Sequence, residues 1–458
     1  MSTINYPILL DERALIKVLC TALGGAAMSS SASIWRLHSR KTVSFAPVPR
    51  WVNVVLSTGV AKGETSQMDP DSTRRLEVMV IEDARTFSLL EREWDELYGE
   101  APLATPFQSW AWLYSWWEHY GEGYGLRLVT MRDGAGLLVG LMPLMVERRW
   151  GFGRLLFVGA GLTDYPDVLL REGWEERASE AGPRALGLMG GWQVADLHHL
   201  RPEAAAWGVL KRWRGPRVRL WHDNYPVIEI GPWDGLLAPL SKNLRSTVRR
   251  TIRRAQADGI QRELVKSEDA SEGGRRLVAL HREAWQGRDI TPEHRTRRFE
   301  AYMEAAARRM TPRGLGGVSE FRRHGDVIVS HFLFFGRGFI GEGLSGATQD
   351  ALGRYQESSL RIWDAVEVAR SKDIPYLNLL RGEEPYKLRW NPRIVPSYRM
   401  ILGRNAVPWA LYAGFHALRS SAKSYAYSEN APGWILRTVS KYRALRQAGI
   451  RYVKSYKR

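Results

Sequence analysis

The segment at 354–390 reads RYQESSLRIWDAVEVARSKDIPYLNLLRGEEPYKLRW, and it decides the fold that we expect. Its first part has the apolar spacing of a helix, and YLNLL at 376–380 is typical of a short buried strand. Polar side chains follow that strand at once, namely Arg381, Glu383, Glu384, Tyr386 and Lys387. Because α/β proteins bind ligands at the carboxyl ends of their strands, the segment predicts an α/β fold with a binding site at this strand end.

The remaining chain shows the same order of elements twice. The first series begins with the strand pattern RLEVMVIED at 75–83 and continues through helical patterns to the core strand LLVGLMPLMV at 137–146. It ends in a short strand pattern at 218–220. The second series begins with one helical pattern at 236–259 and ends with the segment quoted above. We therefore expect a mixed α/β sheet built from two similar units, with domains at 75–230 and 231–403.

Composition places the chain among globular proteins and limits its chemistry. Of its 458 residues, 44% are hydrophobic and 25% are charged. The single cysteine, Cys20, excludes an internal disulfide and a cysteine metal cluster. The formal net charge of +17 favours polyanions, such as the phosphates of a cofactor, RNA or an anionic membrane face. The alternative is an arginine-rich surface that has no such partner.

Both ends of the chain differ from its middle. Residues 1–74 show no steady period, so we interpret them as a disordered leader or an upstream extension of the gene, with Met68 and Met79 as alternative starts. The tail at 404–458 is helical in pattern, and its part at 431–458 is basic throughout. This part suits an anionic membrane surface or packing on its own domain. No stretch is long and apolar enough to span a bilayer, and we expect a cytoplasmic protein, either free or peripheral at the inner membrane.

Several local patterns have two interpretations. The neighbours His198 and His199 have no carboxylate at ligand spacing, so we expect no metal site. The glycine-rich VGAGLTD at 158–164 lacks the flanking helix of a phosphate-binding loop, and we interpret it as a turn. The arginines within 245–254 form either a solvated helix face or an anion-binding one. His281 and Trp285 lie one helical turn apart, as a packing pair or as acceptor contacts.

These segments together resemble the CelD-type, BioF-like acetyltransferases of the GNAT superfamily. The most specific block is LLRGEEPYKLRW at 379–390, whose order of residues is shared with the related FemAB-type peptidyltransferases. Further likeness lies in FQSWAWLYSWW, GLLVGLMPLM, NLRSTVRRTIRRAQADG and LHREAW, and the whole resemblance covers 76–403. It implies tandem GNAT-like acyltransferase domains without a metal, in which an acyl group passes from acetyl-CoA or another acyl-CoA to a polar acceptor. That acceptor would be a small-molecule or sugar-linked precursor of the cell envelope or of an exopolysaccharide such as cellulose.

The resemblance also implies where the donor binds. In GNAT proteins the CoA pyrophosphate lies on backbone N–H groups at a helix start. The corresponding turn here holds the cofactor-binding residues Arg354, Gln356, Ser358 and Ser359. The family has glycines where this chain has Glu357 and Ser359, and a side chain limits the approach of the backbone to a phosphate. Either Glu357 points outward and a serine caps the helix, or CoA binding has weakened or been lost.

The same resemblance assigns roles around the cleft. Arg381, Lys387, His281 and Trp285 would contact the acceptor. Tyr386 would protonate the leaving thiolate, and Glu384 or Glu342 would act as the base. The alternative is an ion-pair network that only closes the end of the sheet.

Two rival functions remain open. One is FemAB-like transfer of an aminoacyl group from tRNA, although we expect nucleic acid less than a small acceptor. The other is a non-catalytic GNAT-fold accessory protein of polysaccharide assembly, docked through the 431–458 tail.

Overall fold

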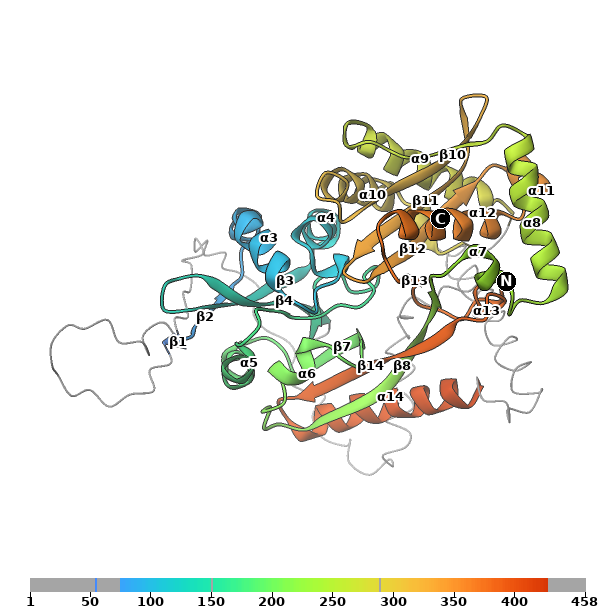
Figure 1. Ribbon diagram of the computed structural model, residues 1–458. Coiled ribbons are helices and arrows are strands. Elements are labelled where there is room, and N and C mark those ends of the chain that lie inside the picture. Colours follow the sequence, from blue (N-terminus) through green and yellow to red (C-terminus); the bar gives the residue numbers. More distant parts are fainter. Residues whose placement is uncertain (1–53, 56–74, 150, 288–289, 427–458) are drawn as a thin grey trace, which may run out of the picture.

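The computed structural model in Figure 1 describes residues 54–55, 75–149, 151–287 and 290–426. Within these residues fourteen strands form one sheet. Two neighbouring pairs, β5–β7 and β12–β13, are parallel, and the other pairs are antiparallel. The predicted α/β class with a mixed sheet is confirmed.

The first half of the described chain runs from a short β1 (Val54–Val55) to β8. Its elements are β2 (Glu77–Ile81), α2 (Ala84–Leu89), α3 (Glu91–Glu100), η2 (Pro106–Gln108), α4 (Trp110–Tyr120), β3 (Tyr124–Arg132), β4 (Leu138–Arg149), β5 (Phe152–Phe157), β6 (Leu169–Leu170), α5 (Glu175–Leu188), β7 (Val194–Leu200), α6 (Ala205–Val209) and β8 (Arg217–Glu229).

The second half begins after β8 with two helices. Its elements are α7 (Trp233–Leu237), α8 (Lys242–Ala257), β9 (Gln261–Leu264), η3 (Ser267–Asp269), α9 (Ala270–Ala284), η4 (Pro292–Arg295), α10 (Arg297–Met310), β10 (Gly316–Arg323), β11 (Asp326–Gly336), β12 (Phe339–Ala347), α11 (Gln349–Arg354), α12 (Glu357–Ser371), β13 (Tyr376–Asn378), α13 (Pro385–Leu388), β14 (Arg393–Gly403) and α14 (Ala406–Ala426).

The strand order reveals a duplication with exchanged ends. It reads β1-β2-β3-β4-β5-β7-β14-β8-β13-β12-β11-β10-β9, with β6 beside β4. The first half contributes β2-β3-β4-β5-β7 from one edge of the sheet, and the second half contributes β9-β10-β11-β12-β13 from the other edge. In each series the fourth and fifth strands are the parallel pair. The last strand of each half then pairs within the other half, because β8 lies beside β13 and β14 lies beside β7. The tandem arrangement expected from element order is therefore present, while the predicted domain boundaries stay a prediction.

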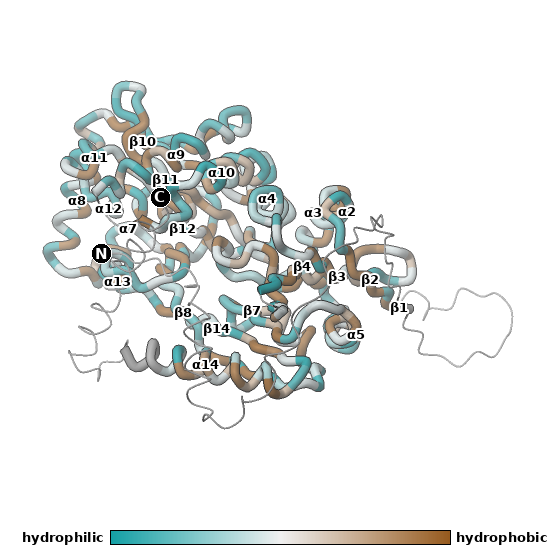
Figure 2. Tube along the Cα trace, turned by 180° about the vertical axis from the view of Figure 1, so that it is seen from behind, coloured by the Kyte–Doolittle hydropathy of each residue, from teal (hydrophilic) through white to brown (hydrophobic). Residues whose placement is uncertain are grey.

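The largest core joins the two halves. Helix α4 begins after Ser109, whose side chain accepts a hydrogen bond from the Trp112 amide, and it buries aromatic side chains on most of its faces. The Trp112 ring lies 5.1 Å from the rings of Tyr302 on α10 and Phe334 on β11. Figure 1 shows α4, α9 and α10 on one side of the sheet and α14 along β8 and β14. Hydrophobic residues gather on strands such as β3, β4 and β10 (Figure 2).

Two element boundaries differ from the sequence prediction. The helix expected at 236–259 is two helices, because Ser241 leaves the helical conformation and caps α8 through the Leu244 amide. The strand expected at 218–220 extends over Arg217–Glu229, since β14 and β13 both pair with it. The core strand at 137–146 is confirmed as β4. Except for β1, the leader at 1–74 lies outside the described residues, as does the 431–458 tail. Within the described part of the chain, no helix is both long and apolar enough to cross a membrane.

Candidate active site

The polar segment after β13 leaves the sheet where two parallel strands separate. Strands β12 and β13 pair only over Phe339–Gly341 and Tyr376–Asn378. Beyond this point β12 continues along β11, whereas the other strand turns away along β8, with hydrogen bonds from the amides of Leu379 and Gly382 to that strand. Gly382 has a φ of 101°, a conformation that glycine adopts without strain. The charged groups that follow therefore face the junction of the two halves.

Arg381 connects this segment with the first half of the chain. Its Nη1 lies 3.2 Å from Nε2 of His199, at the end of β7. Its Nη2 donates to the carbonyl of Gly161 at 2.9 Å, and its Nε lies 3.3 Å from Oδ1 of Asp164. Gly161 and Asp164 belong to the VGAGLTD segment, which is the turn that the sequence predicted. The turn is part of the site, because it supplies a carboxylate and a carbonyl to the predicted arginine.

A buried tyrosine orders the same cluster. The Tyr225 hydroxyl donates to Oδ1 of Asp164 at 3.1 Å and lies 3.0 Å from Nδ1 of His199. Since that hydroxyl proton goes to Asp164, Nδ1 of His199 carries a proton and donates it to the hydroxyl oxygen. Nε2 of His199 is then the acceptor that faces Arg381. Burial raises the pKa of Asp164, and the charge of Arg381 opposes that shift.

Lys387 and Glu384 form a buried pair within the segment. Nζ of Lys387 lies 2.8 Å from Oε2 of Glu384 and donates to the Arg381 carbonyl at 2.8 Å. These contacts hold Arg381 in place from its own backbone. Glu383 accepts a hydrogen bond from the Asn224 side chain at 3.1 Å. The ion pairs of the alternative interpretation are thus present, and the segment is anchored to β8, while the predicted roles of these residues stay a prediction.

Glu342 lies on β12 just beyond the last residue that pairs with β13. It forms an ion pair with Arg361 of α12, which also pairs with Glu357. Nδ1 of the fully buried His331 lies 3.7 Å from Oε1 of Glu342, and its Nε2 lies 2.8 Å from Oδ2 of Asp364. Charges of alternating sign thus run through the interior from the start of α12 to the end of the parallel pair.

Tyr386 meets this second cluster through the same arginine. Arg361 lies over the Tyr386 ring at 5.5 Å from its centroid. Burial lowers the pKa of Arg361, and its hydrogen bond with Tyr386 opposes that shift. The predicted acid, Tyr386, and one predicted base, Glu342, therefore share one buried guanidinium.

Three of the residues predicted to bind the acyl donor lie at the start of α12. Gln356 is the N-cap residue, and its Oε1 accepts a hydrogen bond of 2.6 Å from the Ser359 hydroxyl. Ser358 is half-buried on the first turn. Glu357 does not point outward, as one sequence interpretation had it, because it turns back to Arg361. The serine cap expected there is not formed, because Gln356 is the N-cap residue and makes no side-chain hydrogen bond to the helix backbone.

Arg354, the fourth residue predicted to bind the acyl donor, forms its ion pair with a residue outside this turn. Its Nη2 lies 2.6 Å from Oδ1 of Asp258 and its Nε 2.7 Å from Oδ2, which makes a two-point ion pair with the end of α8. The hydrogen bond with Asp258 raises the pKa of Arg354. A phosphate at this turn would have to share Arg354 with that carboxylate.

The predicted pair lies at the end of α9, where His281 is in the last turn and Trp285 is the C-cap residue. Nδ1 of His281 donates to the Ser345 carbonyl at 2.6 Å, and its Nε2 lies 2.9 Å from Nδ1 of His294. Helix α9 packs directly on β12, since a Cβ at Gly346 would overlap the backbone of His281. Burial lowers the pKa of His281 to about 4 and that of His294 to about 3, so both rings are neutral at pH 7. Trp285 is half-buried, with its ring centroid 6.2 Å from that of His281.

The structure thus sorts the predicted residues into neighbouring groups. Arg381, Glu384 and Lys387 share one cluster, while Tyr386 and Glu342 share another. Sequence reasoning did not assign Asp164, His199 or Tyr225 to this site, because it interpreted the segment that holds Asp164 as a turn and expected no metal at His199. The only signal for them was polar residues directly after strands or turns, as in GLTDY and DLHHL.

A duplicated mixed α/β unit with a polar site beside its separating parallel strands defines a protein with the GNAT-type fold. Residues 242–388 match the family described as "Acetyltransferase (GNAT) domain". No curated protein matches the chain in sequence.

Solved structures are similar to this chain at low sequence identity. FemX has a TM-score of 0.50 and 10% identity, over 68% of this chain and 95% of FemX. The C-terminal domain of a lysylphosphatidylglycerol synthetase from Agrobacterium fabrum has a TM-score of 0.45 and 12% identity, over 71% and 95% of the two chains. A tandem GNAT protein from the clavulanic acid biosynthesis pathway has a TM-score of 0.35 and 10% identity, over 72% and 99%. The likeness to FemX supports the fold and nothing more specific.

Proposed function

We propose that the protein transfers an acyl group from an acyl-CoA thioester to an amine or hydroxyl of a polar acceptor, such as a precursor of the cell envelope or of an exopolysaccharide. One observation carries this proposal. The region matched to the GNAT family, 242–388, contains β12, α12, β13 and the polar segment, which together build the buried charged site.

The thioester would bind where β12 and β13 separate. Past Gly341 and Asn378 the two strands no longer pair with each other. A crevice at the carboxyl ends of strands, where the path of the chain diverges, is a common ligand site in α/β proteins. Backbone N–H groups in such a crevice can stabilise the oxyanion of acyl transfer. Glu342 is the next residue of β12, so the reacting carbonyl would lie close to a charged pair.

The two clusters support acid–base roles. Glu342 and Glu384 each have a cationic partner, Arg361 or Lys387, and either carboxyl group would act as the general base. Tyr386 shares Arg361 and would supply a proton to the leaving thiolate. Arg381 and Lys387 would attract an anionic group of the acceptor.

Thermal unfolding of the full chain with and without acetyl-CoA tests the donor. A ligand that binds only the folded state stabilises it by about 2.7 kcal/mol at a hundred times its dissociation constant. We expect a rise in Tm of a few degrees that is smaller in Arg354→Gln. The matched control is Arg370→Gln, because Arg370 is an exposed arginine at the other end of α12. The shift caused by the ligand is compared within each variant, so a lower basal Tm does not confuse the result. No shift with acetyl-CoA or longer acyl-CoAs would overturn the proposed donor.

A second candidate is FemAB-like aminoacyl transfer from tRNA, and the observation that favours it is the outer face of α8. That face exposes four arginines, Arg249, Arg250, Arg253 and Arg254. Binding to phosphates through these side chains would weaken steeply with salt. Tighter binding of charged than of uncharged tRNA, together with no effect of acyl-CoA on Tm, would favour this candidate over the first.

A further inference from the structure

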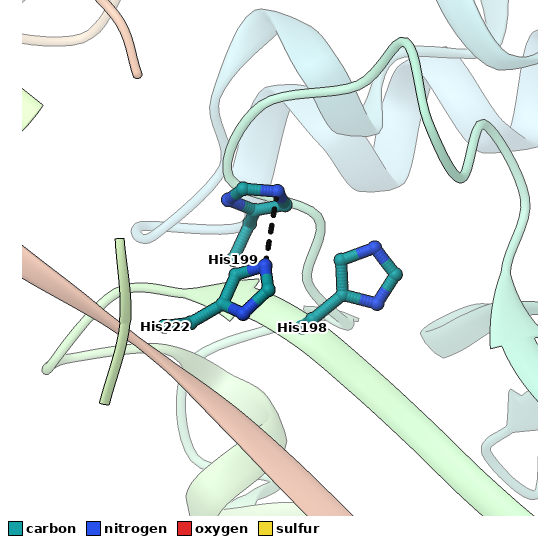
Figure 3. Close-up of side chains that lie close together, drawn as sticks. All are labelled: His198, His199 and His222. Carbon is teal, nitrogen blue, oxygen red and sulfur yellow. Dashed lines mark hydrogen bonds between the residues drawn. The ribbon is translucent and has the colours of Figure 1, made fainter. Parts of the chain in front are cut away.

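Three histidines that form no metal-binding motif in the sequence lie close together at the junction of the two halves. His198 and His199 lie near the end of β7, and His222 lies on β8. One ring nitrogen of each residue lies within 4.8 Å of those of the other two. Figure 3 shows the three rings gathered together, with the contact between His199 and His222 dashed. We propose that His198, His199 and His222 bind a divalent transition-metal ion of the zinc type.

The spacing of the ring nitrogens fits such an ion. Zinc binds histidine nitrogen at about 2.0–2.1 Å in tetrahedral geometry, which places two ligand nitrogens about 3.3 Å apart. Nε2 of His199 and Nε2 of His222 are 3.3 Å apart. Two of the three ligands therefore already stand at the required separation. His222 is half-buried, and its ring centroid lies 5.2 Å from that of His198, the third ligand.

The backbone explains how two adjacent residues reach the same cluster. Successive side chains of a strand point to opposite faces. His199 breaks this alternation with a φ of 64°, a left-handed conformation that is uncommon for residues other than glycine. The ring centroids of His198 and His199 are 5.2 Å apart as a result. Backbone strain of this kind is found where a precise side-chain placement is needed.

In two of the rings, Nδ1, the nitrogen opposite the proposed metal position, contacts an oxygen atom. Nδ1 of His199 donates to the Tyr225 hydroxyl, which donates in turn to Asp164. Nδ1 of His198 lies 3.4 Å from the Asp196 carbonyl. Histidine ligands of metals commonly donate their second ring N–H to an oxygen in this way, which fixes the ring and leaves Nε2 for the metal. Neutral imidazole without thiolate suits Zn²⁺, Co²⁺ or Ni²⁺ better than Mg²⁺ or Ca²⁺.

Arg381 is the competitor of the metal. Its Nη1 lies 3.2 Å from Nε2 of His199, the atom that would bind the ion. On binding, the guanidinium gives up this hydrogen bond and keeps its contacts with the Gly161 carbonyl and Asp164. The metal and the Arg381 guanidinium thus compete for the same nitrogen, Nε2 of His199. Removal of this positive charge should tighten binding, whereas removal of a histidine should weaken it.

The test uses the full chain after treatment with a chelator. Zn²⁺ is titrated by calorimetry, and Co²⁺ is titrated by its visible absorption. We expect one equivalent to bind with the intense absorption of four-coordinate cobalt. His222→Gln should weaken binding more than ten-fold, and Arg381→Met should strengthen it. The matched control is His324→Gln, at an exposed histidine in the β10–β11 turn, which should change nothing.

Thermal unfolding of each variant confirms that it is folded before its affinity is compared. Binding that is absent, or that is equal in the wild type and in His222→Gln, overturns the site. Weaker binding in Arg381→Met would show that the arginine is not a competitor and would overturn the geometry proposed. None of these measurements involves acyl transfer, so their failure leaves the proposed function standing.

Discussion

Arg361 is the residue on which the Glu342 cluster depends. Its side chain is 4% exposed and that of Glu342 is 1% exposed, so both charges are shielded from water. A buried ion pair adds little over an apolar pair of the same shape, but loss of one partner leaves an uncompensated charge. The difference in stability between the single and the double variant therefore measures how strongly these charges are shielded from water.

We expect Arg361→Met to lower the free energy of unfolding by about 3–5 kcal/mol, because Glu342 then remains charged in the interior. The double variant Arg361→Met with Glu342→Gln should recover most of that loss. Urea unfolding of both single variants and the double variant gives the coupling. Arg370→Met, on the exposed part of the same helix, should stay within about 0.5 kcal/mol of the wild type. Strictly additive losses in the double variant would mean that the two side chains do not interact.

Burial between packed elements gives the histidines of α9 and η4 their low pKa values. His281 donates to the β12 carbonyl of Ser345 and accepts from His294, and His294 stacks on Phe299 of α10 with ring centroids 4.2 Å apart. A proton added to Nε2 of His281 would face the N–H of His294. Burial comes first among the causes that lower both pKa values.

The free energy of unfolding should fall as the pH is lowered from about 6.5 to about 4. In this window the unfolded state binds protons at His281 and His294, whereas the folded state, with pKa values of about 4 and about 3, does not. The lowered pKa of His281 alone should reduce the free energy of unfolding by on the order of 3 kcal/mol across this window. We expect His281→Asn to make the pH dependence of urea unfolding less steep, and His324→Asn, on the surface, to leave it unchanged. A wild-type slope in His281→Asn would show that this ring titrates normally in the folded protein.

Individual elements were predictable where the signal is local. Apolar alternation is enough to locate β4, and helical spacing followed by YLNLL is enough to locate α12 and β13. The full length of β8 was not predictable, because its pairing with β13 and β14 involves residues more than 140 positions away. Asp164 was missed for the same reason, since its partner Arg381 lies 217 positions further along the chain.

At the scale of the whole molecule, the exchange of β8 and β14 ties the halves together. Ten residues of β14, from Arg393 to Leu402, are registered against β8. Each of these strands also pairs with the fifth strand of the opposite half. The site lies in this exchanged region, because Arg381 follows β13 while His199 and Tyr225 lie on β7 and β8. The element order expected from sequence thus holds, but element order alone gives no sign that the last strands are exchanged.

This exchange predicts that neither half folds alone, although the predicted domain boundary at 230 divides them cleanly in sequence. A fragment of residues 1–231 would lack β14 and leave one side of β7 unpaired, and a fragment of residues 232–458 would lack β8 beside β13. Unpaired central strands expose backbone groups and apolar surface that the intact sheet covers. We expect each fragment by itself to show no cooperative unfolding by circular dichroism, and an equimolar mixture to recover a cooperative transition. The intact chain, cleaved at an inserted protease site after Gly231, is the control and should stay associated. Cooperative unfolding of either isolated fragment would show that the halves are independent domains and that the exchanged strands add only to their association.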